Sequence, residues 1–179
     1  MAHNTNKSGL VLENLSAGYQ KKIIVDEISL AIPPQKITVL VGANGCVKST
    51  LLSTIARLLQ PLGGAALLDG KAIHQQPTKA VARQLGILPQ SPLDEDEQAV
   101  EEALRLTGTA EFAHLPVESL SGGQRQRCWI AMVLAQQTPY ILLDEPTTFL
   151  DLRYQVEILE LLHTLTRQHG RTVVVVLHD

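Results

Sequence analysis

Short apolar runs, divided by glycine, proline and acidic residues, fill the first part of the chain. Runs of this length that are rich in leucine, isoleucine and valine predict β-strands, and the residues between them favour turns. The Asp69-Gly70 pair is typical of a two-residue hairpin turn. The expected strands are Leu10–Leu15, Ile23–Val25, Ile28–Ile32, Ala65–Leu68 and Lys71–Ile73. This part of the chain is therefore predicted to form an antiparallel β lobe.

Continuous apolar runs alternate with segments of helical periodicity in the rest of the chain. A continuous apolar run is typical of a strand buried on both faces, whereas apolar residues three or four apart are typical of a helix. The expected strands are Ile37–Val41, Leu85–Leu88, Tyr140–Leu143 and Thr172–Leu177. The expected helices are Ser49 to about Leu59, Thr78–Gln84, a helix with Val100, Ala103 and Leu104 on one face, Gln124–Gln137, and a long helix that ends at Gly170 with an apolar stripe of Leu152, Val156, Leu159, Leu162 and Leu165. This alternation predicts an α/β fold with a mostly parallel sheet flanked by helices.

Composition narrows the classes of function. The chain has 179 residues, of which 45% are hydrophobic and 3% aromatic, and its formal net charge is −3. This length allows one domain with a well-formed core. A weakly acidic chain with few aromatic residues lacks the features of a nucleic-acid-binding protein, so we expect no nucleic-acid partner. The first nine residues lack the apolar core of a secretory signal, and no apolar run approaches the roughly 20 residues of a membrane span. We therefore expect any membrane role to come through a partner.

The two cysteines, Cys46 and Cys128, lie far apart in the sequence. They form neither a CxxC pair nor a cluster with histidine, which argues against a disulfide framework and is typical of the reducing cytoplasm. We expect both to be small buried side chains, because free cysteine is usually buried.

A glycine-rich segment lies between the apolar run Ile37–Val41 and the helix that follows it. A phosphate-binding loop occurs in this position, between a buried strand and a helix. Its backbone N–H groups form a concave anion site, which the positive end of the helix reinforces. We expect Lys48 to contact the β- and γ-phosphates of a nucleotide and Ser49 to bind Mg²⁺ through its hydroxyl. The residues of the loop are Gly42, Ala43, Asn44, Gly45, Cys46, Val47, Lys48, Ser49 and Thr50.

Val47 departs from the phosphate-loop pattern G-x-x-x-x-G-K-[ST], which has glycine at this position. Glycine is used where φ is positive or where the backbone approaches a ligand closely. A β-branched residue held at positive φ costs about 1–3 kcal/mol. We therefore predict that Val47 distorts the loop or crowds the phosphates, and that it weakens nucleotide binding.

Two carboxylates, Asp144 and Glu145, close the apolar strand that begins at Tyr140. In phosphoryl transfer one carboxylate can hold the Mg²⁺ shell while the next polarises a water for in-line attack on the γ-phosphate. We assign Asp144 to Mg²⁺ and Glu145 to the general base. A strand end of this kind can also be a simple turn, and the preceding phosphate loop is what favours catalysis.

A second glycine turn, Ser121-Gly122-Gly123-Gln124, begins the next predicted helix. A helix N-terminus is a candidate anion site, and it can equally be an ordinary helix cap. Arg125 and Arg127 lie beside it and add positive charge, although arginine is also common on protein surfaces.

The segment Leu120–Gln124 resembles the LSGGQ signature of ATP-binding cassette (ABC) proteins. It lies between the phosphate loop and the acidic strand end, as in that family. The segments Ser121–Gln136 and Asp144–Asp151 are most similar to the ATPases of ferric-siderophore importers, with cobalamin and haem importers as close relatives. The resemblance extends over nearly the whole chain. It implies a P-loop NTPase (RecA-like) core with an N-terminal antiparallel β lobe and a helical subdomain.

The resemblance also implies roles for single residues elsewhere. Tyr19 is similar to the aromatic residue that stacks on adenine, and Asp151 to the D-loop aspartate. Gln90 is similar to the Q-loop glutamine, which serves Mg²⁺ and catalysis, and His178 to the switch histidine, which handles the attacking water and the γ-phosphate. Each has a simpler interpretation. These are a packed loop aromatic for Tyr19, a helix N-cap for Asp151, a solvated amide for Gln90 and a polar strand end for His178.

Partners follow from the same resemblance. In the family two copies bind two ATP molecules head to tail, so Ser121, Gly122, Gly123 and Gln124 are expected to reach the nucleotide of a second copy. Closure of this dimer would drive transmembrane permease subunits, with a substrate-binding protein as an indirect partner. The expected location is peripheral, on the cytoplasmic face of a bacterial inner membrane. The expected cofactors are ATP and Mg²⁺.

Length is the remaining departure from the family. We expect one ABC ATPase domain over residues 1–179, with the β lobe and phosphate loop within 10–75, a helical subdomain at 91–123 and the rest of the core at 124–179. The helical subdomain is shorter than in siderophore-importer ATPases, and the sequence changes abruptly near Pro92–Leu93. Relatives continue beyond His178, so we expect a partial record or a truncated gene.

Three hypotheses for function follow. The first is the ATP-binding and ATP-hydrolysing subunit of an importer, for ferric siderophores or alternatively for haem or cobalamin. The second is an impaired or inactive cassette with a binding or regulatory role, which Val47 and the short segments favour. The third is a non-transport cassette that acts on ribosomes or DNA. The sequence disfavours the third, since it contains neither a coiled-coil insertion nor a second cassette.

Overall fold

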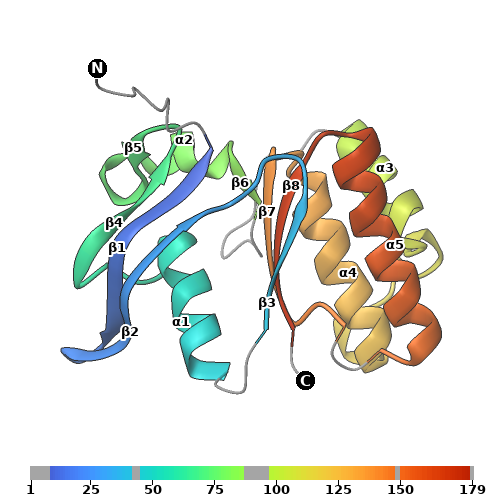
Figure 1. The fold of residues 1–179 in the computed structure, drawn as a ribbon. Coiled ribbons are helices and arrows are strands. Elements are labelled where there is room, and N and C mark those ends of the chain that lie inside the picture. The colour runs from blue at the N-terminus through green and yellow to red at the C-terminus, as the bar shows by residue number, and fades with distance from the viewer. Residues whose placement is uncertain (1–8, 42–44, 87–96, 148–149, 178–179) are drawn as a thin grey trace.

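The computed structural model describes residues 9–41, 45–86, 97–147 and 150–177. These residues form two four-stranded sheets, with one helix between the sheets and three helices on the far side of the second sheet (Figure 1). The strands are β1 (Leu10–Tyr19), β2 (Lys22–Ala31), β3 (Ile37–Leu40), β4 (Gly63–Leu68), β5 (Lys71–Ala72), β6 (Leu85–Gly86), β7 (Tyr140–Asp144) and β8 (Thr172–Val176). The helices are α1 (Gly45–Ile55), α2 (Thr78–Ala82), α3 (Glu97–Thr107), α4 (Gly122–Ala135) and α5 (Leu152–Gln168), and the 3-10 turns are Ile73–Gln75, Ala110–Phe112 and Val117–Ser119.

The first sheet is antiparallel, with the strand order β2-β1-β4-β5. The prediction of an antiparallel β lobe is therefore confirmed. The two short strands expected at Ile23–Val25 and Ile28–Ile32 are instead one strand, β2, whose pairing with β1 is interrupted by register shifts. Asp26, which was expected to divide the two strands, lies at this irregularity beside Glu27, which has a φ of 47°. The residue Ile73, expected in a strand, begins a 3-10 turn.

The second sheet is parallel, with the strand order β3-β8-β7-β6. Its strands separate two hydrophobic clusters, one shared with the β lobe and α1, the other with α4 and α5. Val174 and Val176 of β8 belong to the first cluster, whereas Val173 and Val175 belong to the second. Because successive side chains of a strand point to opposite faces, burial on both faces requires the continuous apolar run seen in the sequence.

The carboxyl ends of the four parallel strands lie at one end of the molecule. The helices α1 and α4 begin at this end, on opposite faces of the parallel sheet (Figure 1). The first helix begins at Gly45, four residues earlier than predicted, so Gly45–Thr50 of the phosphate-loop segment is helical. Ligands of open α/β sheets bind beyond the carboxyl ends of the strands, which places a candidate site here.

The buried face of α5 differs from the predicted stripe. Leu162 and Leu165 are buried as expected, but Leu152, Val156 and Leu159 are 76%, 46% and 42% exposed. Ile158 packs into the core with the first two. The prediction was wrong because the helix carries two stripes with the same i, i+4, i+7 spacing. At 17 residues α5 is the longest described helix, and in the described ranges no helix is long and apolar enough to cross a membrane.

Candidate active site

Lys48, the fourth residue of α1, brings a positive charge to the carboxyl end of the parallel sheet. Only 6% of its surface is exposed. Its Nζ donates a hydrogen bond to the main-chain oxygen of Leu177, 3.0 Å away, and the Leu177 N–H in turn donates to the Leu40 oxygen at the end of β3. A buried ammonium needs oxygen partners of this kind, because an unpaired buried charge is costly. The charge lies where the phosphates of a nucleotide are expected.

Ser49 and Asp144 come together from segments 95 residues apart. The Ser49 hydroxyl donates a hydrogen bond to Oδ2 of Asp144 across 3.2 Å. A hydroxyl and a carboxylate are oxygen ligands of the kind that Mg²⁺ prefers, together with substrate phosphates. The described part of the chain holds no group of three or more His, Cys, Asp and Glu residues that could bind a metal by itself. The Ser49 hydroxyl and the Asp144 carboxylate fit the oxygen ligands of a Mg²⁺ ion.

Glu145 has a left-handed backbone, with a φ of 50°. Its N–H donates to the main-chain oxygen of Val176, 2.8 Å away on β8, and its own carbonyl oxygen accepts a hydrogen bond from Nε2 of Gln126 across 3.1 Å. The main chain of the proposed base is thus held from two sides. Sequence reasoning missed Gln126. The sequence offered one signal for it. Gln126 is a polar residue four positions before Ile130, so it lies on the face of α4 that packs into the core.

A cavity of about 380 Å³ lies between α1, α4 and β7. Its wall combines apolar side chains of the two helices with Asp144 and Glu145. Asp144 is exposed and Glu145 is half-buried, so neither residue is enclosed in the packed core.

The signature segment forms the N-terminus of α4. Ser121 is the N-cap, and its Oγ accepts a hydrogen bond from the Gln124 N–H at 3.2 Å. The Gln124 side chain accepts from the Ser121 N–H at 3.0 Å, which completes a capping box. The helix-cap interpretation is thus correct as a description of the free chain. Ser121 and Gly122 are exposed, and α4 lies across the sheet from α1, so this N-terminus lies apart from Lys48.

Tyr19 ends β1 at the tip of the β1–β2 hairpin. Its side chain is 50% exposed, and the tip lies at the same end of the molecule as the start of α1 (Figure 1). The exposed ring is available for stacking. Asp151 is the N-cap of α5, where its Oδ1 accepts a hydrogen bond from the Tyr154 N–H at 3.1 Å. The N-cap interpretation of Asp151 is therefore confirmed, and a D-loop role stays a prediction.

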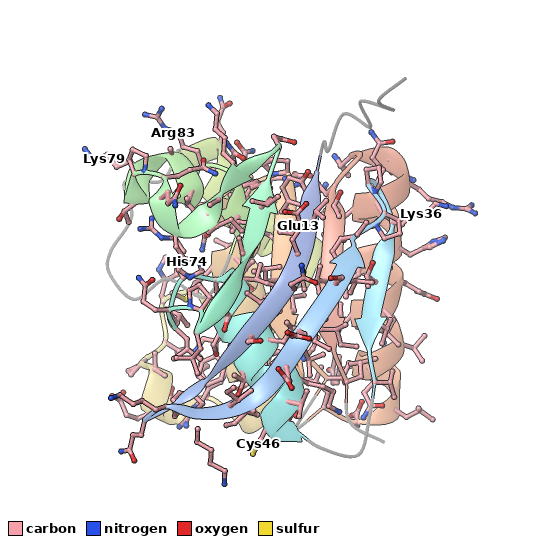
Figure 2. The ribbon with its side chains drawn as sticks, turned by 60° about the vertical axis from the view of Figure 1, so that its left-hand side comes forward. Glu13, Lys36, Cys46, His74, Lys79 and Arg83 are labelled. Carbon is pink, nitrogen blue, oxygen red and sulfur yellow. The ribbon has the colours of Figure 1, made fainter. Side chains whose placement is uncertain are left out.

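Two expectations about the phosphate-loop segment need correction. Val47 lies within α1 and does not have a positive φ, so the backbone strain that we predicted is absent. It is half-buried and packs against the core cluster of the β lobe and α1, which leaves crowding of the phosphates as the remaining prediction. Cys46 is exposed at the start of α1 (Figure 2), and Cys128 is only half-buried, so the expectation of two buried thiols was wrong.

Several predicted site residues lie outside the described residues. They are Gly42, Ala43, Asn44, Gln90 and His178. Thr50 is described, and it is buried in α1, where its carbonyl oxygen accepts a hydrogen bond from the Thr54 hydroxyl at 2.8 Å.

Comparison with protein families gives one match. The family described as ABC transporter matches residues 25–148, which is more than half of the chain. Two curated relatives illustrate the similarity. The achromobactin transport ATP-binding protein CbrD of Dickeya dadantii is 48% identical, over 96% of this chain and 74% of the relative. The probable siderophore transport system ATP-binding protein YusV of Bacillus subtilis is 50% identical, over 96% of this chain and 72% of the relative.

These alignments are longer than the chain itself. Each spans 198 positions, which is 19 more than the 179 residues of the chain, so each relative has at least 19 residues without a counterpart here.

Solved structures share the fold. The dimeric structure of the bacterial ABC transporter cassette MJ0796 has a TM-score of 0.83 and 27% identity, over 95% of this chain and 88% of that one. The same values describe a dimeric post-hydrolysis state of MJ0796 bound to ADP and inorganic phosphate.

Proposed function

The chain belongs to the ABC transporter family, and we propose that it is the ATP-hydrolysing subunit of an importer for ferric siderophores. The observation that carries the proposal is the contact of Ser49 with Asp144 beside the buried Lys48. This contact joins the phosphate-loop helix to the acidic strand end. The siderophore assignment is supported by the names of relatives that are 44–50% identical to the chain, among them CbrD, YusV and the ferric enterobactin transport protein FepC of Escherichia coli.

Each residue of the site has a role in this proposal. Lys48 and the N-terminus of α1 bind the β- and γ-phosphates. Ser49 and Asp144 would hold Mg²⁺, which would supply positive charge beside the phosphate oxygens. Glu145 accepts a proton from the attacking water. Tyr19 stacks on the adenine ring, and Gln90 and His178 complete the site as the family resemblance implies.

The working unit is proposed to be a head-to-tail dimer. In a single chain the N-termini of α1 and α4 lie on opposite faces of the parallel sheet (Figure 1). Ser121 and Gly122 are exposed, so the Ser121–Gln124 segment would be able to bind the nucleotide on the α1 of a second copy. The dimeric state of the MJ0796 cassette supports this arrangement.

Coupling to transmembrane permease subunits is the final part of the proposal, with a peripheral position on the cytoplasmic face of the inner membrane. We place the positions that this chain lacks between Gln90 and Ser121, where the sequence changes abruptly. The alignments that exceed the length of the chain support a shortened segment.

Uptake of radioactive iron tests the function directly. Deletion of the gene for this chain from its own organism is expected to abolish uptake of ⁵⁵Fe from ferric siderophores. The wild-type gene should restore uptake, and Lys48→Ala should not. Uptake of haem and cobalamin, measured in the same strains, should be unaffected. Loss of haem or cobalamin uptake with intact siderophore uptake would contradict the substrate assignment.

A further inference from the structure

Gln126 is a buried amide that donates to the main chain of the proposed base. Only 8% of its surface is exposed, and its Nε2 lies 3.1 Å from the carbonyl oxygen of Glu145. Buried polar groups are almost always hydrogen-bonded, because a lost bond leaves a desolvated group unpaired. This bond joins α4 to the end of β7 across 19 residues of sequence.

Glu145 needs support of this kind because its conformation is unfavourable on two counts. Its φ of 50° is left-handed, which is uncommon for a residue with a Cβ. It also precedes Pro146, and a residue before proline is biased towards extended backbone. Such conformations persist only where the surroundings over-determine them. Here the Val176 carbonyl holds the N–H of Glu145, and Gln126 holds its C=O.

The hydrogen bond from Gln126 to the carbonyl of Glu145 is important because there is free space around Glu145. Gln126, Glu145 and Pro146 all line the cavity of about 380 Å³ between α1, α4 and β7. Close packing does not fix the peptide on this side, so the hydrogen bond supplies the constraint. The two hydrogen bonds fix the main chain of Glu145, from which its carboxylate extends.

We propose that Gln126 is a positioning residue for ATP hydrolysis, which holds the backbone of Glu145 so that its carboxylate reaches the attacking water. This inference rests on the proposed role of Glu145 as the base. Gln126 acts through the main chain of Glu145 and touches neither the nucleotide nor the reacting atoms.

Two substitutions remove the bond with little change of shape. Gln126→Met keeps the length of the side chain without a donor, and Gln126→Glu is isosteric, with an ionised carboxylate that cannot donate. The matched control is Gln76→Met, since Gln76 also donates its Nε2 to a main-chain oxygen, that of Lys71 at 3.1 Å, in the β lobe away from the site. Glu145→Gln and the double variant Gln126→Met/Glu145→Gln complete the set.

The readouts are the Kd for Mg-ATP and the single-turnover rate of hydrolysis by the full chain, measured also in a Val47→Gly background. Both Gln126 variants should bind Mg-ATP within about twofold of wild type and hydrolyse it roughly 10- to 100-fold more slowly, the range expected for a misplaced catalytic group. Gln76→Met should match wild type. The double variant should hydrolyse ATP no more slowly than Glu145→Gln alone, because Gln126 affects hydrolysis only through Glu145.

Three results would overturn the proposal. Wild-type hydrolysis by both Gln126 variants, with Glu145→Gln inactive, would remove Gln126 from the mechanism and leave the base in place. A double variant slower than Glu145→Gln by the same factor as the single change would indicate general damage to the fold. Wild-type hydrolysis by Glu145→Gln would instead refute the assignment of the base on which the proposal rests.

Discussion

The guanidinium carbon of Arg127 on α4 lies over the Tyr154 ring on α5, 4.4 Å from its centroid, and also over the Phe112 ring, 5.3 Å from its centroid. Tyr154 is the third residue of α5, and its N–H donates to the N-cap Asp151. The cation therefore links the helix that begins with the signature segment to the helix that begins with the D-loop residue. Its Nε is buried and has no hydrogen-bond partner within the described ranges, so the rings are its main neighbours there.

Arg127→Lys tests this link. A lysine ammonium cannot reproduce the planar stacking of a guanidinium on two rings. We expect the free energy of unfolding to fall by about 1 kcal/mol, the scale of a partly desolvated cation–π contact. Urea denaturation measures the change. The control is Arg153→Lys, an exposed arginine paired with Glu157 at 3.3 Å, for which a much smaller change is expected. Equal losses for the two variants would contradict the link.

Asp144→Asn tests the Mg²⁺ assignment. The variant keeps the shape of the side chain but removes the charge that attracts the ion. We expect the affinity for ATP in EDTA to be unchanged and the gain in affinity on adding Mg²⁺ to fall by at least about tenfold. Isothermal titration with and without Mg²⁺ provides the measurement. Glu160→Gln on α5 is the matched control, and a Mg²⁺-dependent gain that survives in Asp144→Asn would assign the ion elsewhere.

Most elements of the fold could be predicted, because buried strands and helix faces have characteristic patterns of apolar residues in the sequence. The strand β8 reads as a continuous apolar run since Val173 and Val174 enter different cores. The apolar runs predicted the β lobe and the parallel sheet, resemblance to ABC cassettes added the P-loop NTPase family of the core, and all three are confirmed. Periodicity could not show which face of α5 is buried. Ile158 and Leu159 both belong to apolar patterns of helical spacing, and only packing against the sheet decides which of the two side chains is buried.

The site was predictable where its chemistry depends on consecutive residues. Lys48, Ser49 and Asp144 were identified from short motifs, and the structure brings them together. The bond from Gln126 to Glu145 was not predictable, since it depends on how α4 docks against the end of β7. The absence of strain at Val47 was also missed, because the helix begins earlier than the motif suggested.

Gly18→Ala tests the position of Tyr19. A Cβ at Gly18 would lie 1.8 Å from the main-chain oxygen of Lys22, so the β1–β2 hairpin would have to open. We expect a loss of stability of roughly 1–3 kcal/mol from this overlap, together with weaker ATP binding as Tyr19 is displaced. Thermal unfolding and ATP titration give the two readouts. Gly63→Ala is the control, because its nearest neighbour would be 3.7 Å away, and similar effects in both variants would refute the steric argument.

The two cysteines should differ in reactivity. Cys46 is exposed at the start of α1, whereas burial raises the pKa of the Cys128 thiol and so lowers its thiolate fraction near pH 8. Iodoacetamide is expected to modify Cys46 first, and Mg-ATP should slow that reaction but not the modification of Cys128. Peptide mass spectrometry follows both sites in one sample, with Cys128 as the internal control. Modification of Cys46 at a rate independent of Mg-ATP would place the nucleotide away from α1.

Binding of Mg-ATP to the wild-type chain, to Val47→Gly and to Lys48→Ala, titrated side by side in one buffer, tests the central claim that α1 and the end of β7 form the nucleotide site. We predict that the wild-type chain binds. Val47→Gly should bind more tightly, because the crowding side chain is gone, although its melting temperature should fall with the loss of a packed residue from a helix. Lys48→Ala should not bind measurably. Binding by Lys48→Ala that equals wild type, in a folded protein, would contradict the account.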